Sequence, residues 1–105
     1  MIQVTQEKRS GWEVVAVRGR ADGEASDQLE DALRSALEQG FKVAVDFSAL
    51  DYISSAGLRA VLQAARAAQA LKVEFAVCGL SPSVKKVFDM SGMHKILTVR
   101  GELPC

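Results

Sequence analysis

The sequence predicts a single α/β domain in which helices pack on one mixed sheet. Short β-rich runs alternate with amphipathic helical patterns after residue 25, and a helix between two strands favours parallel neighbours joined by a right-handed crossover. Two β-rich runs separated by a turn at the start favour an antiparallel hairpin instead. A length of 105 residues allows one core and not two, so the predicted domain spans residues 1–105. The expected order is β-β-α-β-α-β-α-β.

The first half is predicted to contain the hairpin, a loop and a helix. Apolar and polar residues alternate over residues 2–6, a turn follows at 9–11, and a second β-rich run covers 12–17. Residues 19–23 are expected to form a loop. An amphipathic helix that ends at Gly40 comes next. Its apolar face is predicted to contain Leu29, Ala32, Leu33, Ala36 and Leu37.

The second half is predicted to alternate strands and helices. A nearly continuous apolar run at 42–47 is typical of a strand covered on both faces. The second helix is expected over 56–70, with Arg59, Gln63 and Arg66 on its polar side. A strand at 73–78 follows, and it ends at Cys78, which we expect to be a buried thiol.

The last predicted elements are a short helix and a strand. Ser81 is a favourable N-cap and Pro82 suits the first helical position, so the third helix is expected to begin there. It is expected to end at residues 91–92, and a final strand is predicted over 96–99.

Composition excludes several classes of function. Thirteen acidic and thirteen basic residues give a formal net charge of zero without a basic patch, so nucleic acid is not an expected partner. No apolar run reaches the roughly 18 residues of a membrane span, and the start lacks the apolar region of a signal peptide. Two cysteines without metal or redox spacing fit a reducing compartment. We therefore expect a cytoplasmic protein with no membrane partner, metal or cofactor.

The most informative segment joins the third strand to the second helix and ends in the paired hydroxyls of Ser54 and Ser55. The first amides of a helix are unbonded and the dipole is positive there, so the position suits an anion, including a phosphate attached to serine. The residue nearer the helix start is expected to direct its hydroxyl toward these amides, which favours Ser55, and Ser54, a competent alcohol one residue away, is the alternative acceptor. An alternative interpretation is a simple N-cap, for which serine is a preferred residue.

Catalytic interpretations find no support in the same segment. A serine nucleophile elbow requires Gly-x-Ser-x-Gly, but Ile53 stands where the first glycine is needed, and nothing pairs the lone His94 with Ser55. Glycine-rich phosphate loops are missing. Asp46 and Asp51 have no further metal ligands in sequence reach and are interpreted as loop and capping residues. The sequence therefore predicts a protein that is not an enzyme.

Three segments resemble the STAS domain, which is found in bacterial anti-sigma-factor antagonists and in sulfate-transporter tails. Residues 46–58 are similar to the family signature, with the sequence Asp-Phe-Ser-Ala-Leu-Asp-Tyr-Ile-Ser-Ser-Ala-Gly-Leu. Residues 19–22 resemble the family's Gly-x-(apolar)-Asp loop, and residues 79–93 are similar to its third-helix segment. The resemblance covers nearly the whole chain and implies a STAS domain over residues 1–105.

In the antagonist branch, an Asp-Ser-(Ser/Thr)-Gly-Leu motif carries a serine that the cognate anti-sigma factor phosphorylates. Aligning Gly57 and Leu58 with this motif places the acceptor at Ser55, with Ser54 in place of the aspartate. Loss of that negative charge implies an altered kinase preference. The resemblance implies that the surface around the acceptor recognises the partner; the residues expected there are Asp22, Gly23, Ser54, Gly57, Arg59 and Gln63.

The resemblance also implies partner switching. The unphosphorylated protein would bind an anti-sigma factor with serine kinase activity and so free the sigma factor. The phosphorylated protein would dissociate from the anti-sigma factor, and a metal-dependent serine phosphatase would restore the unphosphorylated form. The alternative is a small STAS subunit of a lipid-transporting ABC complex, whose partner is an ATPase. A threonine commonly stands near the switch site in that branch, so the serine here favours signalling.

Family members usually continue into a last helix beyond the position of Cys105. We therefore expect one face of the sheet to be covered incompletely, and a partner or dimer contact to cover it. The expected state is a monomer or weak dimer.

Overall fold

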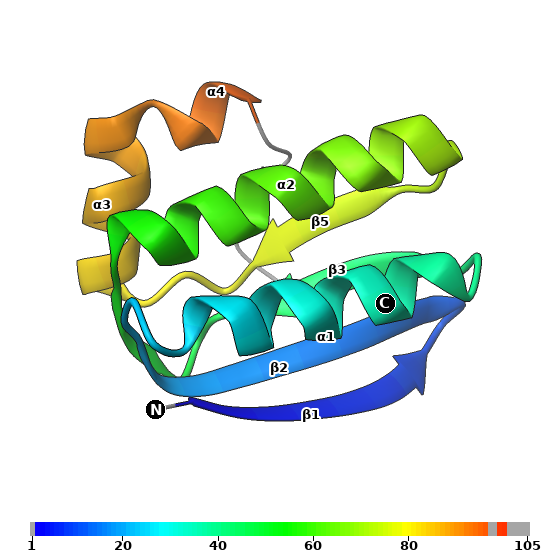
Figure 1. Ribbon diagram of the computed structural model, residues 1–105, viewed down its shortest axis with the longest axis horizontal. Coiled ribbons are helices and arrows are strands. Elements are labelled where there is room, and N and C mark those ends of the chain that lie inside the picture. Colours follow the sequence, from blue (N-terminus) through cyan, green and yellow to red (C-terminus); the bar gives the residue numbers. More distant parts are fainter. Residues whose placement is uncertain (1, 97–98, 101–105) are drawn as a thin grey trace.

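The computed structural model describes residues 2–96 and 99–100 of the chain, without the side chains of residues 94, 96, 99 and 100. Strands and helices form a mixed sheet with helices packed on it, which confirms the predicted α/β class (Figure 1). The elements are β1 Ile2–Arg9, β2 Trp12–Ala21, α1 Ser26–Glu38, β3 Lys42–Asp46, β4 Leu50–Ile53, α2 Ser55–Leu71, β5 Phe75–Cys78, α3 Pro82–Ser91, α4 Met93–Ile96 and β6 Val99–Arg100.

The sheet has the strand order β1-β2-β3-β5-β6, and β4 pairs with β2 off this path. The predicted hairpin is present, because β1 pairs antiparallel with β2 from Ile2 opposite Gly19 to Arg9 opposite Trp12. The other pairings are parallel. Helices α1 and α2 lie side by side over one face, and α3 lies near the start of α2 (Figure 1).

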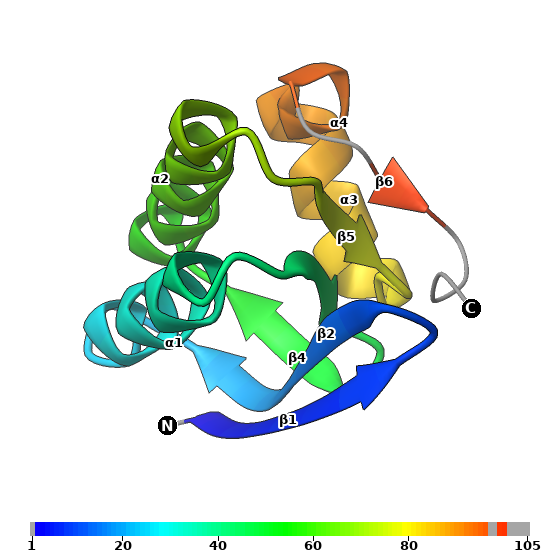
Figure 2. The ribbon, with the colours of Figure 1, turned by 90° about the vertical axis from the view of Figure 1, so that its right-hand side faces the viewer.

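Strand β2 is longer than the sequence predicts, because it pairs with two strands in succession (Figure 2). Its first half pairs with β3 and its last residues pair with β4. The register shifts between Gly19 and Arg20, and Gly19 has a φ of 102°, a backbone conformation that favours glycine. The prediction of a loop over residues 19–23 was therefore wrong up to Ala21, where β2 ends.

Strand β4 is absent from the predicted order, which expected a loop between the third strand and the second helix. Its burial does not alternate: Leu50 and Ile53 are buried, whereas Asp51 and Tyr52 are exposed. Because a strand is recognised by strict alternation, a four-residue strand next to a register shift carries no such signal. This strand leads directly into α2 and so positions its first residues.

The predicted limits of α3 are confirmed, but the last strand differs from the prediction. Gly92 has a φ of 77° and ends α3, and the buried Met93 begins the short helix α4. Ile96 belongs to that helix, so the predicted strand over 96–99 was wrong at its start. Strand β6 begins at Val99, while residues 97–98 lie outside the described residues.

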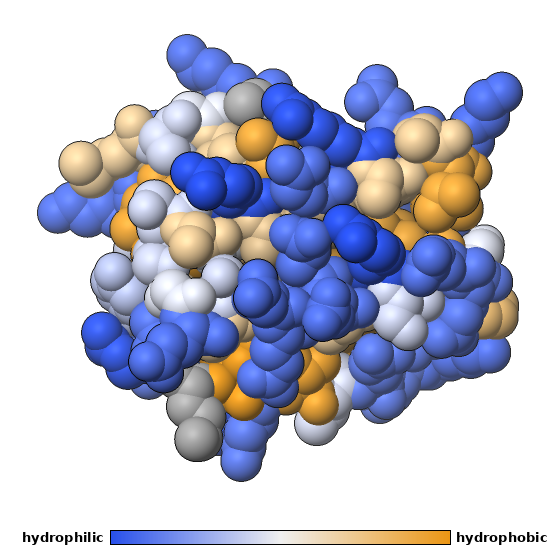
Figure 3. Space-filling model, in the orientation of Figure 1, coloured by the Kyte–Doolittle hydropathy of each residue, from blue (hydrophilic) through white to orange (hydrophobic). Residues whose placement is uncertain are grey.

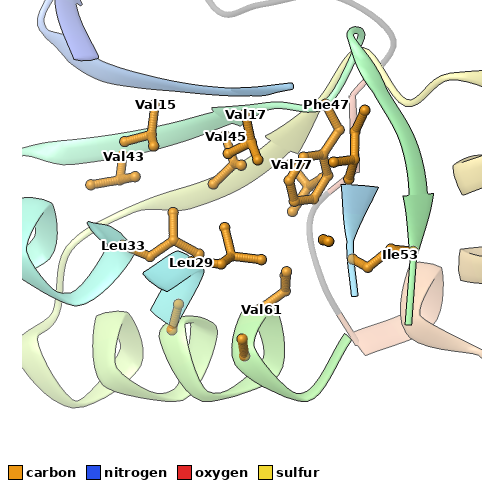
Figure 4. Close-up of a cluster of buried hydrophobic side chains, with 14 of the residues drawn as sticks. Val15, Val17, Leu29, Leu33, Val43, Val45, Phe47, Ile53, Val61 and Val77 are labelled. Carbon is orange, nitrogen blue, oxygen red and sulfur yellow. The ribbon is translucent and has the colours of Figure 1, made fainter. Parts of the chain in front are cut away.

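The core between the helices and the sheet contains large side chains from the sheet and α1 but small ones from α2 (Figure 4). Helix α1 buries Leu29, Leu33 and Leu37 completely. The buried residues of α2 are Gly57, Ala60, Val61, Ala64 and Ala68. Among the described residues, no helix is long and apolar enough to cross a membrane.

A second buried cluster consists of Trp12, Val14, Ala44, Ala76 and Cys78. Alternation along the strands places these residues on the sheet face opposite the main core. The burial of Cys78 confirms its predicted role as a core thiol. All five residues are buried, so this cluster forms no open apolar patch. That a partner or dimer contact completes the cover of this face stays a prediction. Residues 101–105, which precede the position of the family's usual last helix, lie outside the described residues.

Candidate functional site

Ser54 is the N-cap of α2. Its backbone is extended, with φ −84° and ψ 171°, and its Oγ accepts a hydrogen bond from the Gly57 amide at 3.1 Å. The Ser54 amide donates to the carbonyl oxygen of Ala21 at 2.8 Å, which ties the start of α2 to the end of β2. The expectation that Ser55 directs its hydroxyl to the free amides was therefore wrong, because the preceding serine already occupies that position.

Ser55 is the first residue of α2 and is exposed. Within the part of the chain that the structure describes, its hydroxyl makes no hydrogen bond. The two serines therefore divide the two roles that the sequence left open. Ser54 caps the helix, and Ser55 presents an accessible alcohol beside the positive end of the helix dipole.

Gly57 allows α2 to approach the sheet closely. A Cβ at this position would lie 2.8 Å from Cγ1 of Ile53 and 3.1 Å from the carbonyl oxygen of Ala21. The residue is buried, so it lies beneath the candidate recognition surface and is not part of the exposed surface itself. Its contribution is to fix the position of Ser54 and Ser55 above β2 and β4.

Asp22 and Gly23 follow the end of β2, next to Ser54. The Asp22 Oδ1 accepts a hydrogen bond from the Ala25 amide at 3.0 Å, and this bond lowers the pKa of the carboxyl group. Asp22 is therefore negatively charged at neutral pH, and it also stabilises the turn before α1. Gly23 is exposed, and its carbonyl oxygen accepts a hydrogen bond from the Ser26 hydroxyl at 2.8 Å.

Arg59 and Gln63 are exposed on α2, as the sequence predicts. They follow Ser55 at intervals of four residues and so share its side of the helix. The structure also brings Arg20 and Tyr52 together on the paired ends of β2 and β4, with the guanidinium carbon 4.5 Å from the ring centre. Sequence reasoning missed this pair, because the pairing of β2 with β4 leaves no local signal.

The start of α3 holds the strand that leads into the site. The Ser81 hydroxyl donates to the carbonyl oxygen of Leu50 at 2.6 Å, and the Ser83 hydroxyl donates to that of Asp51 at 3.1 Å. Ser81 thus occupies the predicted N-cap position but uses its side chain to bind β4. The start of α2 is consequently held by its hydrogen bond to β2 and by β4, which is itself bonded to the start of α3.

The carboxylates near the site form local contacts. Asp46 is the last residue of β3, and its Oδ1 accepts a hydrogen bond from the Ser48 amide at 2.9 Å, so it caps the turn that follows. Asp51 lies within β4, so the interpretation of these two residues as loop residues was wrong. No group of three or more potential metal ligands occurs among the described residues. The side chain of His94 lies outside the described part of the chain.

Comparison with known proteins identifies the family. Residues 4–99 match a family model described as "Mlab, STAS domain". The chain is 35% identical over 99 residues to BtrV of Bordetella bronchiseptica, which bears the name of an anti-sigma factor antagonist, with 93% of this chain and 85% of the relative covered. It is 27% identical over 100 residues to the anti-sigma F factor antagonist of Paenibacillus polymyxa, with 93% and 86% covered.

A solved structure shares the fold. The crystal structure of an anti-sigma factor antagonist from Mycobacterium paratuberculosis superposes with a TM-score of 0.86 at 22% identity, over 98% of this chain and 88% of that one. The fold is therefore that of a small α/β domain, and in this chain a serine-capped helix lies at one end of the sheet. The chain belongs to the STAS domain family, which confirms the resemblance seen in the sequence.

Proposed function

We propose that this protein is an anti-sigma-factor antagonist that acts in the cytoplasm through partner switching, with Ser55 as its phosphorylation site. The observation that carries the proposal is the division of roles at the start of α2. Ser54 Oγ is engaged with the Gly57 amide, whereas the Ser55 hydroxyl is exposed and makes no hydrogen bond within the described residues. The names of the two relatives reported above support the same function.

A kinase partner would transfer the γ-phosphoryl group of ATP to Ser55 Oγ, which forms a phosphate ester and releases ADP and a proton. A metal-dependent serine phosphatase would hydrolyse the ester with water and return the free hydroxyl. This chain is the substrate in both steps and supplies no catalytic group. Its contribution is to present the accessible hydroxyl of Ser55 at the start of α2, which is bonded to β2, so that a kinase can reach it.

The proposed switch acts on the interface and leaves the fold intact. A phosphate adds a charge of about −1.5 to −2 at neutral pH. At the start of a helix this charge is favourable by roughly 0.3–1 kcal/mol. The same charge inside a packed and desolvated protein contact costs more, on the order of the 2 kcal/mol that defines an interface hot spot. Phosphorylation should therefore reduce affinity without unfolding the domain.

The test combines labelling with binding. The anti-sigma factor kinase of the same organism and ATP should place one phosphate on Ser55, as located by peptide mass spectrometry. Ser55→Ala should abolish labelling, and Ser54→Ala should preserve most of it. Ser55→Asp should weaken binding to the kinase while its melting curve stays close to that of the wild type. Phosphate on Ser54, or labelling that survives Ser55→Ala, contradicts the assignment.

The same binding experiment separates the proposal from a role in lipid transport. A STAS subunit of an ABC complex would copurify with an ABC ATPase, whereas an antagonist would copurify with a kinase of the histidine-kinase-like ATPase class. Sedimentation of the free protein would establish whether it is the expected monomer or weak dimer.

A further inference from the structure

The exposed side of α2 carries a stripe of positive charge that continues from Ser55. Helix α2 contains no acidic residue, and its charged side chains are those of Arg59 and Arg66. With 3.6 residues per turn, Ser55, Arg59, Gln63 and Arg66 fall within an arc of about 80°. All four are exposed, and we call them the basic stripe. Figure 3 shows strongly hydrophilic side chains projecting over α2, with less polar surface between them.

The arginines of the basic stripe are not used within the chain. On α1, Arg34 pairs with Glu30 at 2.8 Å, and on α3, Lys85 pairs with Asp89 at 3.5 Å, each across one helical turn. Arg59 and Arg66 have no acid three or four residues away, because α2 contains none. Neither forms an ion pair with any residue that the structure describes.

Helix stability does not account for these positions either. Basic side chains stabilise a helix near its C-terminus, where the dipole is negative. The last turn of α2 has no basic residue, and Arg59 is instead the fifth residue from the positive end. The two positive charges therefore neither stabilise the helix dipole nor form an intrahelical ion pair, and they remain available to another molecule.

We propose that the basic stripe of α2 binds an acidic surface of the anti-sigma factor, and that a phosphate on Ser55 weakens this contact by cancelling the charge of the stripe. The proposal rests on the function proposed above and names the chemistry of the partner. The stripe includes the acceptor serine itself, so it is continuous with the switch. A phosphate of about −1.5 to −2 nearly equals, with opposite sign, the charge of the two arginines.

The neighbouring helix argues for an acidic occupant in a fixed orientation. Helix α1 carries four acids and one arginine in its sequence and lies beside α2 (Figure 1). A partner that presents acidic groups to α2 is repelled if it shifts onto α1, since like charges facing each other are costly. The difference in charge between α1 and α2 would thus determine the orientation in which the partner docks as well as its affinity.

The test compares two variants that lower the net charge by the same amount. Arg59→Gln/Arg66→Gln removes both charges of the basic stripe and keeps good helix formers. Arg9→Glu makes an equal change in net charge next to the turn between β1 and β2, at the opposite end of β2 from Ser54. Affinity for the purified anti-sigma factor of the same organism is measured by calorimetry at low and high salt, with unphosphorylated and phosphorylated protein.

The double variant should bind more than tenfold more weakly than wild type at low salt and lose most of the salt dependence, while Arg9→Glu stays within about threefold. Phosphorylation should then cost the double variant much less affinity than it costs the wild type. Equal affinities of the two variants, or an equal cost of phosphorylation in wild type and double variant, overturn the inference. Failure of unphosphorylated wild type to bind overturns the proposed function instead. Melting curves verify that each variant is folded.

Discussion

Helices α1 and α2 cover the same face of the sheet, yet they pack on it in different ways. Helix α1 fills the space with the leucines at positions 29, 33 and 37, all completely buried. Helix α2 buries a glycine, three alanines and one valine, and its start lies against the backbone of β2. Because truncating a large buried side chain leaves a cavity, α1 should tolerate smaller residues poorly. Because the backbone of α2 lies close to the sheet, α2 should tolerate larger residues poorly.

The outer surfaces of the two helices differ as well. The arginine of α1 is neutralised by an acid on the same helix, and that helix starts at a turn stabilised by Asp22. Helix α2 leaves its two arginines unpaired within the described residues and exposes Ser55 at its first position. The comparison indicates that α1 mainly stabilises the domain, while α2 is positioned accurately so that its surface can be used by another molecule.

The largest effect is expected from loss of volume under α1. Leu33→Ala should lower the free energy of unfolding by about 2–5 kcal/mol, because the cavity left in the core cannot close fully. Leu71→Ala, at the exposed end of α2, is the matched control and should change stability by less than about 1 kcal/mol. Urea denaturation followed by circular dichroism measures both. Similar losses in the two variants would show that α1 is not the main stabilising helix.

Added volume under α2 should have the next largest effect. Gly57→Ala should lower stability by about 1–3 kcal/mol, because the new methyl group meets the carbonyl oxygen of Ala21, a backbone atom that cannot rotate away. This cost exceeds the gain of about 0.5–1 kcal/mol that alanine brings inside a helix. Gly23→Ala, where a Cβ would meet nothing within 4 Å, is the control. A Gly57→Ala protein as stable as wild type would contradict close approach at this position.

Substitution of the two serines should change stability less, and the two substitutions should differ clearly from each other. Ser54→Ala should cost about 1 kcal/mol, because the Gly57 amide loses its acceptor. For a domain of this size that loss lowers the melting temperature by roughly 4–8 °C. Ser55→Ala should leave the melting temperature nearly unchanged, since its hydroxyl has no partner among the described residues. If calorimetry showed a larger decrease in melting temperature for Ser55→Ala than for Ser54→Ala, Ser55 would be the cap.

Asp22→Ala is expected to have a smaller effect on stability than Ser54→Ala. The hydrogen bond from the Ala25 amide lowers the pKa of the Asp22 carboxyl group. Its stabilising contribution is therefore present at neutral pH and is lost as the pH falls below about 3.9, the usual value for aspartate, toward the lowered pKa of the folded state. The small difference in melting temperature between wild type and Asp22→Ala should thus narrow below about pH 4.

A second variant separates the structural role of Asp22 from its charge. Asp22→Asn keeps an acceptor oxygen for the Ala25 amide but removes the negative charge. If the carboxylate pairs with a basic group of the partner, both variants should bind the anti-sigma factor more weakly, while only Asp22→Ala melts slightly earlier. A larger loss of stability in Asp22→Ala with full binding would make this residue a structural cap only.

The sequence by itself determined the α/β class, the hairpin, the approximate limits of α1, α2 and α3, and the location of the serine pair at the start of a helix. These features depend on residues close together in the chain, because periodicity, helix stops and capping residues act within a few positions. The polar side of α2 with Arg59, Gln63 and Arg66 also follows from its sequence alone, since exposed positions repeat with the helical period.

The tertiary structure decided which serine caps α2, how β4 forms and why Gly57 is needed. Each of these features depends on β2, which is distant in the sequence: Ala21 accepts the Ser54 amide, and its backbone oxygen lies where a Gly57 side chain would extend. The change of partner along β2 at Gly19 creates this arrangement. Such contacts join segments about thirty residues apart, so their geometry follows from strand pairing and not from local pattern.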